Sequence, residues 1–184
     1  MREWTIVIPV KGTDAAKSRL GATRELARAI AQDTVDAALQ VAPVIVVTAA
    51  APTDFPGTRV VPDPGLGLAA AVGAGIAAAS GPVAVLLGDL PALRPEELRS
   101  ALLAASTLDR AFVADAEGTG TSLITSVADH AAAFGEGSAQ RHRDAGYVEL
   151  DVEPGSGLRS DVDTPDQLER LRERVGPRTR SQLP

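Results

Sequence analysis

The sequence contains no cysteine, and this absence excludes several kinds of site together. Without thiols the chain can form no disulfide, no thiolate nucleophile and no cysteine-based zinc site. The two histidines, His130 and His142, stand apart from each other and do not suggest a metal site. We expect both to be surface residues, so the chemistry should depend on other side chains.

Long apolar runs are absent as well. No stretch of about 18 uncharged apolar residues is present, as a membrane-spanning helix would need, and the opening "MREWTIVIPVKG" does not resemble a signal peptide. The net charge of −6 argues against a nucleic-acid surface, which needs a basic face. We therefore expect a cytoplasmic protein with neither a membrane nor a nucleic acid as partner, whose local positive charge suits a small anionic ligand.

Lysine is scarce, and its location is informative. The lysines are Lys11 and Lys17, both shortly after the apolar run "TIVIPV", with Arg19 close behind; every other basic residue is arginine. A lysine ammonium can contact phosphate oxygens, and Gly12 allows backbone amides to approach a phosphate. The spacing is not that of a Walker motif. A solvated basic turn is the alternative, but the restriction of lysine to this segment favours a phosphate site.

The order of the apolar segments predicts the fold class. A chain of 184 residues with 45% hydrophobic content suits one α/β domain. Strand-like and helix-like patterns alternate, which predicts a largely parallel sheet with helices on both faces. The expected strands are residues 5–10, 44–48, 58–61, 83–89, 111–114, 122–125 and 147–152, and the expected helices are 24–41, 66–79, 95–105 and 165–175.

The end of the chain has both a clear helix start and a segment without apolar periodicity. Thr164 with Gln167 forms a capping box before the last expected helix. The following "GPRTRSQLP" lacks apolar periodicity. We therefore predict one domain over residues 1–176 and a disordered tail over 177–184.

Carboxylates follow two of the expected strands, at the edge where open parallel sheets bind ligands. Asp89 comes directly after "VAVLLG", and Asp161 and Asp163 lie in "SDVDTPDQL". In an extended segment their spacing places both side chains on one side. Such carboxylates suit Mg²⁺, a hard cation with oxygen ligands. The alternatives are a turn role for Asp89 and a helix-capping role for one of the other two.

Hydroxyl groups in glycine-rich segments form another candidate anion site. Thr121 and Ser122 lie in "GTGTSLIT", and Ser138 follows "FGEG". We expect a short helix that extends to Arg143 and has Ser138 as its N-cap. The first backbone amides of this helix would face an anion.

Four motifs in this order, "IPVKGTDAAKSRL", "GDLPAL", "GTGT" and "RSDVDTPDQL", resemble the guanylyltransferases of coenzyme F-420 biosynthesis. That family transfers GMP from GTP to phosphoenolpyruvate or 2-phospho-L-lactate. The resemblance extends from about Thr5 to Val175. It implies a nucleotidyltransferase fold of the glycosyltransferase-A type with a Rossmann-like half, and transient contact with the next enzyme of the pathway.

The resemblance also implies roles for particular residues. Asp89 and Asp161 would hold Mg²⁺, and Thr121, Gly135 and Ser138 would bind the three-carbon phosphate. Lys11 and Lys17, assisted by Arg19, would neutralise the triphosphate and the charge that grows during transfer. A phosphate acceptor is already ionised at neutral pH, which fits a site without an obvious catalytic histidine.

One segment departs from the family pattern. "DPGLGLAAAVGAG" stands where relatives resemble "GLNxAL", and Leu68 replaces the polar Asn of a loop expected to contact base and ribose. Asp63 and the backbone near Gly65 and Gly67 could still contact the base. A purely structural turn explains the glycines nearly as well.

Several alternatives remain open at this point. The Arg-rich, Lys-poor composition suggests a GC-rich genome, and actinobacterial members of the family are associated with phosphoenolpyruvate. Because 2-phospho-L-lactate differs only slightly from phosphoenolpyruvate, it remains the alternative acceptor. Nucleotidyltransferases acting on molybdopterin, or on a methylerythritol phosphate with CTP, resemble "LAAGxxxR" in the first loop, which differs here. A sugar transferase would need a DxD pair. A nucleotide-binding regulator without turnover is the alternative from another class.

Overall fold

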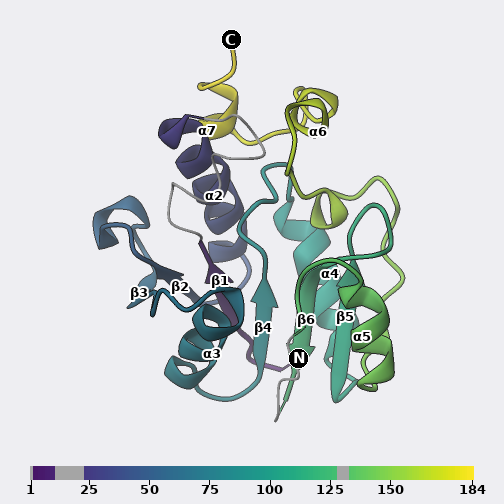
Figure 1. The fold of residues 1–184 in the computed structure, drawn as a ribbon. Helices are drawn as coiled ribbons and strands as arrows, with labels where there is room; N and C mark the ends of the chain where they lie inside the picture. The colour runs from purple at the N-terminus through teal and green to yellow at the C-terminus, as the bar shows by residue number, and fades with distance from the viewer. Residues whose placement is uncertain (1, 11–22, 128–132) are drawn as a thin grey trace.

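A computed structural model describes residues 2–10, 23–127 and 133–184 (Figure 1). These residues form a seven-stranded sheet in the order β3-β2-β1-β4-β6-β5-β7. The strands are β1 Thr5–Pro9, β2 Val44–Thr48, β3 Arg59–Pro62, β4 Val83–Leu86, β5 Arg110–Ala114, β6 Thr121–Ser126 and β7 Val148–Glu149. The helices are α2 Arg24–Leu39, α3 Leu68–Ala78, α4 Pro95–Ala105, α5 Ser138–Asp144, α6 Pro165–Arg170 and α7 Pro177–Arg180, with 3₁₀ turns η1 Pro52–Asp54 and η2 Gly157–Arg159.

The sheet is mostly parallel, which confirms the sequence prediction. Strands β1 to β4 run parallel, and β7 is parallel to β5. The exception is β6, which runs antiparallel to both of its neighbours, β4 and β5. A short turn joins β5 to β6, as in a hairpin. The start of β6 therefore lies at the edge where β4 and β5 end.

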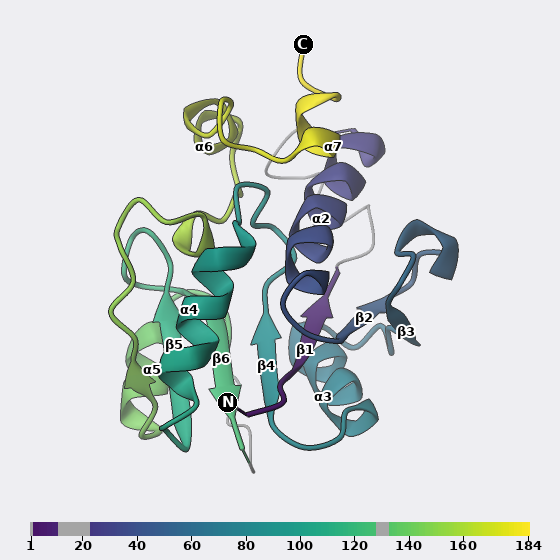
Figure 2. The ribbon, with the colours of Figure 1, turned by 180° about the vertical axis from the view of Figure 1, so that it is seen from behind.

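Helices cover both faces of the sheet, and strand alternation decides which residues meet which helix. In β1, Ile6 and Ile8 pack in one cluster with residues of α2 and α4, whereas Val7 packs in a second cluster with residues of α3 and α5. Successive strand residues point to opposite faces. Figure 1 shows α3 and α5 in front of the sheet, and Figure 2 shows α2 and α4 on the other side.

The last part of the chain is packed, so the prediction of a disordered tail is wrong. Residues 177–180 form α7, and Thr179 is fully buried. The carboxylate of Asp33 in α2 accepts hydrogen bonds from the backbone amides of Arg178 (3.1 Å) and Thr179 (2.7 Å). A buried charge caps this short helix, which its local sequence cannot reveal. The capping box of Thr164 and Gln167 is confirmed, although α6 ends at Arg170 and continues only as turns.

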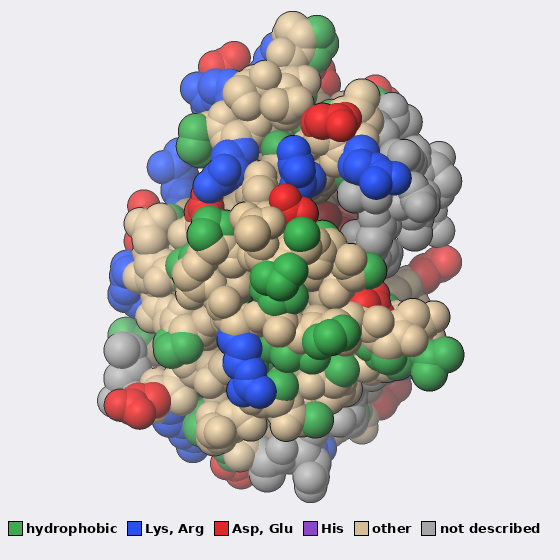
Figure 3. Space-filling model, turned by 90° about the vertical axis from the view of Figure 1, so that its left-hand side faces the viewer, with side chains coloured by type: hydrophobic (Ala, Val, Ile, Leu, Met, Phe, Trp, Pro, Cys, Tyr) green, Lys and Arg blue, Asp and Glu red, His purple; other side chains and the backbone are tan. Residues whose placement is uncertain are grey.

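The outer surface shows where charge gathers. Figure 3 views the side that lies on the left in Figure 1, and its basic side chains are concentrated in the upper half, where the parallel strands end. Hydrophobic side chains on this side lie scattered among backbone and other side chains. None of the described helices is long and apolar enough to span a bilayer.

Candidate active site

The lysine segment begins after the carboxyl end of β1. Lys11, Gly12, Lys17 and Arg19 lie outside the described residues, so the structure does not place their side chains. It does place both ends of the segment: the amide of Val10 donates to the carbonyl of Val47 (2.9 Å), and Thr23 caps α2. The segment therefore starts at the edge of the sheet that holds the other candidate loops, and it ends at the first turn of α2.

Asp89 follows β4 in a turn that α2 holds in place. The hydroxyl of Thr34, a buried residue of α2, accepts a hydrogen bond from the Leu90 amide (3.1 Å). Its single hydrogen lies between the Ile30 carbonyl (3.1 Å) of its own helix and the more distant Gly88 carbonyl (3.4 Å). At Gly88 a Cβ would lie 3.2 Å from the Pro9 carbonyl oxygen, so glycine lets this turn approach the end of β1. The turn thus lies beside the end of β1, where the lysine segment starts, and Asp89 comes next in the chain.

Asp161 lies next to this turn. The Val162 amide donates to the Asp89 carbonyl (3.0 Å), which brings the two predicted metal ligands together. Burial raises the pKa of the Asp161 carboxyl to about 7, and the carboxylates of Asp89, Asp115 and Asp163 act in the same direction. Its Oδ1 atom is buried and has no hydrogen-bond partner among the residues that the structure describes. A desolvated carboxylate oxygen among other acidic groups fits a bound cation.

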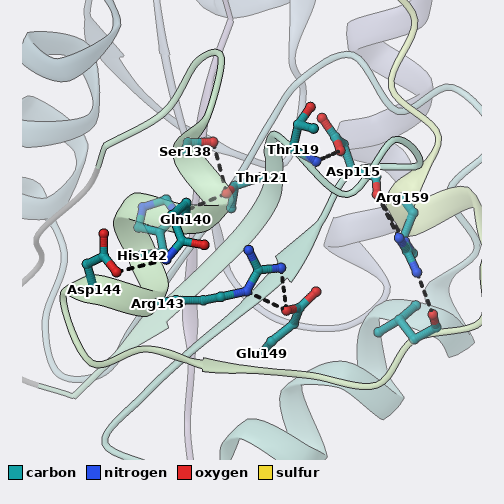
Figure 4. Close-up of polar contacts among 11 residues, drawn as sticks. Asp115, Thr119, Thr121, Ser138, Gln140, His142, Arg143, Asp144, Glu149 and Arg159 are labelled. Carbon is teal, nitrogen blue, oxygen red and sulfur yellow. Dashed lines mark hydrogen bonds and ion pairs between the residues drawn. The ribbon is translucent and has the colours of Figure 1, made fainter.

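Asp115 is an acidic neighbour that the sequence analysis missed. Carboxylate oxygens of Asp115, Glu117 and Asp161 lie within 4.8 Å of one another, so they could share a divalent cation. Asp115 already accepts hydrogen bonds from the amides of Thr119 (3.0 Å) and Gly120 (2.7 Å), and its carbonyl accepts from Arg159 (Figure 4). It comes directly after β5, and Asp89 comes three residues after the end of β4. This position at the end of a strand was the available signal.

Thr121 and Ser138 form a buried pair at the same edge. Ser138 Oγ lies 3.0 Å from Thr121 Oγ1, and both residues are almost fully buried (Figure 4). The prediction that Ser138 caps α5 is wrong: Gly137, with a φ of +69°, is the N-cap, and Ser138 is the first helical residue. Only glycine adopts such a φ readily, which frees the Ser138 side chain to reach Thr121.

Two other predicted residues lie close by but differ in what they offer. Gly135 has a φ of +105°, and its carbonyl accepts from the Ser138 amide, so it shapes the loop before α5. Ser122 turns away from Thr121, because successive residues of a strand face opposite sides. Its hydroxyl donates to the Val113 carbonyl (3.4 Å). The structure thus groups Thr121, Ser138 and Gly135, and leaves the Ser122 hydroxyl within the sheet.

His142 is fully buried, so its prediction as a surface residue is wrong; His130 lies outside the described residues. The ring of His142 bonds to Thr121 Oγ1 through Nδ1 (2.9 Å) and accepts at Nε2 from the Ala133 amide (3.2 Å). Burial lowers the pKa of His142 to about 4, and the charge of Arg141 adds to this effect. The ring is therefore neutral at neutral pH.

The loop expected to contact the nucleotide base follows β3. Asp63 accepts a hydrogen bond from the Gly65 amide (2.9 Å), which closes a tight turn. Gly65 and Gly67 have φ values of +73° and +91°, and Gly67 precedes α3, so both glycines have a structural reason. Leu66 is 82% exposed. The loop is at the side of the sheet opposite to the Thr121 and Ser138 pair.

Sequence comparison places the chain in a known group. Residues 19–149 match the MobA-like NTP transferase domain. Proteins named phosphoenolpyruvate guanylyltransferase from Streptomyces scabiei and Streptomyces coelicolor are each 47% identical, and in both cases the match covers 96% of this chain and 94% of the relative. The chain belongs to the phosphoenolpyruvate guanylyltransferase family.

Solved structures agree with this family at the level of the fold. A nucleotidyl transferase from Methanothermobacter has a TM-score of 0.65 at 20% identity, covering 94% of this chain and 97% of its own. A manganese complex of Rv0371C from Mycobacterium tuberculosis also has a TM-score of 0.65, at 22% identity, covering 95% of this chain and all of its own. The expected single-domain, glycosyltransferase-A-like nucleotidyltransferase fold is thereby confirmed. The transferase family itself is shown by the sequence relatives.

Proposed function

We propose that this protein transfers GMP from GTP to phosphoenolpyruvate in coenzyme F-420 biosynthesis. The observation that carries the proposal is the near-complete match, at 47% identity, to proteins named for this activity. The position of the candidate residues supports it, because carboxylates, hydroxyls and the start of the lysine segment all lie at the edge where β1, β4 and β5 end. The reaction would take place in the cytoplasm, and the product would pass to the next enzyme of the pathway.

The proposed reaction joins two ionised phosphates. An oxygen of the acceptor phosphate attacks the α-phosphorus of GTP, the bond from that phosphorus to the oxygen bridging to the β-phosphate breaks, and pyrophosphate leaves. The products are enolpyruvyl-diphospho-guanosine and pyrophosphate. Because the attacking oxygen is already deprotonated, catalysis depends mainly on positioning and on fixed positive charge. Lys11 and Lys17, with Arg19, supply that charge around the triphosphate, and Gly12 lets the backbone approach it.

The acidic residues fit the divalent cation that the family would use. Asp89 and Asp161 lie side by side, and the buried Oδ1 of Asp161 offers an oxygen ligand for Mg²⁺. When bound, the cation neutralises charge on the phosphates and orients them. Asp115 and Glu117 are close enough to share it. A manganese complex is known for the structural relative Rv0371C, which has a similar fold.

The remaining predicted residues divide between the two substrates. Thr121 and Ser138 would donate to anionic oxygens of phosphoenolpyruvate, with backbone of the Gly135 loop beside them. Asp63 and the backbone at Gly65 and Gly67 would contact the base and ribose. Ser122 would contribute through its place in β6 rather than through its hydroxyl.

The test is pyrophosphate release with Mg²⁺, using GTP, CTP or ATP in every pairing with phosphoenolpyruvate or 2-phospho-L-lactate, and no acceptor as the blank. We expect release only with GTP and phosphoenolpyruvate, with the product identified by mass spectrometry. Release with 2-phospho-L-lactate alone would change the acceptor, and release with CTP would point to another nucleotidyltransferase. Nucleotide binding without release in any pair would indicate a regulator.

A further inference from the structure

The buried histidine has a position that the proposed reaction does not yet use. His142 lies in α5 with its ring between β6 and the segment before α5 (Figure 4). Three aromatic rings surround it, with centroid distances of 5.7 Å to Phe112, 5.9 Å to Phe134 and 5.2 Å to Tyr147. Such packing holds the ring in one orientation and keeps water away from it.

The contacts of the ring determine which nitrogen carries its hydrogen. A backbone amide can only donate, so Nε2 must accept from Ala133 at 3.2 Å and cannot itself be protonated. A neutral imidazole has a single N–H, which must then be on Nδ1. Nδ1 lies 2.9 Å from Thr121 Oγ1 and therefore donates to it.

With this tautomer, the two hydroxyls of Thr121 and Ser138 retain one hydrogen that can be donated to a ligand. Thr121 and Ser138 carry one hydroxyl hydrogen each, and the 3.0 Å contact between them uses one of the two. Whichever hydroxyl donates to the other, one hydrogen has no acceptor among the described residues. With the opposite tautomer, Nδ1 would accept from Thr121, Thr121 would accept from Ser138, and no hydrogen would remain.

We infer that His142 is a positioning residue that makes the Thr121 and Ser138 pair a net donor to an anionic oxygen of the acceptor substrate. This rests on the proposed function, in which these two hydroxyls bind phosphoenolpyruvate. A spare hydroxyl hydrogen in a buried site favours a carboxylate or phosphate oxygen, because charge-assisted hydrogen bonds are the stronger ones. His142 acts through Thr121 and does not contact the acceptor.

The same ring also fixes the loop that carries Gly135. Its Nε2 holds the Ala133 amide, and Arg141 donates to the carbonyls of Ala133 (3.1 Å) and Glu136 (2.8 Å). In addition, the Ala139 amide donates to the Thr119 carbonyl (3.0 Å), which ties α5 to the turn before β6. One neutral ring thus links the two segments that would face the acceptor.

Two amide variants separate the two nitrogens of the ring. In His142→Asn the amide group reaches the position of Nδ1 and can still donate to Thr121, whereas in His142→Gln it extends toward the position of Nε2. We expect His142→Gln to raise the KM for phosphoenolpyruvate at least tenfold, with the KM for GTP within about twofold of wild type. His142→Asn should retain a KM for phosphoenolpyruvate within about threefold. Unchanged acceptor KM in His142→Gln, or an equal rise for both substrates, would overturn the inference.

A direct measurement of the tautomer keeps the test independent of activity. Nitrogen-15 NMR of the wild-type protein at pH 7.5 should show the His142 hydrogen on Nδ1, with the resonance assigned by its loss in His142→Gln. A hydrogen on Nε2 in a protein that releases pyrophosphate would overturn the role of His142. Wild-type protein that releases no pyrophosphate with any acceptor would instead overturn the proposed function, while the spectrum still decides the hydrogen-bond network.

Discussion

The Val162 amide donates a hydrogen bond of 3.0 Å to the Asp89 carbonyl, and this contact joins the turn after β4 to the segment before α6. Its consequence is to hold the Asp161 carboxylate in a desolvated position beside other carboxylates. Buried like charges destabilise a fold unless a cation or a proton neutralises them. The candidate metal site should therefore lower the stability of the metal-free protein.

Because of this charge repulsion, we expect Asp161→Asn to stabilise the metal-free protein but to lower its activity. Between pH 3.8 and about 7 the folded protein holds a proton on Asp161 that the unfolded chain has released, so wild-type stability falls as pH rises through that window. The Asn variant lacks this loss, which amounts to at most about 1.4 kcal/mol per pH unit. In EDTA at pH 8 it should therefore melt at a higher temperature than wild type, yet lose Mg²⁺-dependent turnover.

The matched control is Asp166→Asn, which removes an exposed carboxylate of α6. Its melting temperature should stay within about two degrees of wild type, and its turnover should be unchanged. If Asp161→Asn melts at or below the wild-type temperature in EDTA, the desolvation argument fails.

The lysine segment gives a prediction about catalysis. Lys17→Ala should lower the rate of pyrophosphate release at least tenfold, because a fixed positive charge near the transferring phosphorus is lost. Its circular dichroism and melting temperature should remain those of wild type. Arg99→Ala is the control, since Arg99 is exposed and, within the described part of the chain, donates to the Gln40 carbonyl. Wild-type turnover in Lys17→Ala would remove this residue from the proposed mechanism.

Sequence reasoning reached the features that depend on neighbours along the chain. The location of Asp89 at the carboxyl end of β4 could be predicted because it comes shortly after a buried apolar run. The capping box of Thr164 with Gln167 could be predicted because it is local. Asp115 also comes after an apolar strand, as Asp89 does, so the sequence could have predicted its location as well.

Features that depend on distant partners were missed. His142 stands between Arg141 and Arg143 in a charged stretch, and its burial comes from Phe112 in β5 and from Phe134 and Tyr147 in the segments on either side of α5. The docking of α7 depends on Asp33, 146 residues before Thr179. The reversal of β6 likewise depends on strand pairing, which periodicity does not specify.

The capping of α7 by Asp33 predicts a large loss of stability on its removal. Asp33→Ala leaves the buried Thr179 amide without its 2.7 Å acceptor and removes the bond to the Arg178 amide. The free energy of unfolding in urea should fall by about 2 to 3 kcal/mol. Asp36→Ala is the control: it removes only the exposed ion pair with the Arg178 guanidinium (2.7 Å), worth at most about 1 kcal/mol. Equal losses in the two variants would contradict the capping role.

His142 predicts a pH dependence opposite in sign to that of Asp161. Between about pH 6.5 and 4 the unfolded chain binds a proton at His142 that the folded protein does not, so this group lowers stability as pH falls. His142→Phe removes that dependence. The stability of wild type relative to the variant should therefore fall by up to about 1.4 kcal/mol per pH unit across this window. Urea unfolding of both proteins from pH 7 to 4.5 measures the difference; a constant difference would show that His142 titrates normally.

Two glycines of α3 provide a matched pair for the packing of the sheet. A Cβ at Gly75 would overlap the side chains of Val7 in β1 and Val47 in β2, whereas a Cβ at Gly73 would meet nothing within 4 Å. Gly75→Ala should therefore reduce the free energy of unfolding by about 1 to 3 kcal/mol, because the helix must move away from the sheet. Gly73→Ala should raise it by up to about 1 kcal/mol, since alanine favours the helix more than glycine does.

Urea unfolding of both variants measures the two effects, and the same sign for both would show that α3 does not lie this close to β1. Since α3 follows the loop of Asp63, Gly65 and Gly67, a shifted helix in Gly75→Ala should also raise the KM for GTP and leave that for phosphoenolpyruvate unchanged.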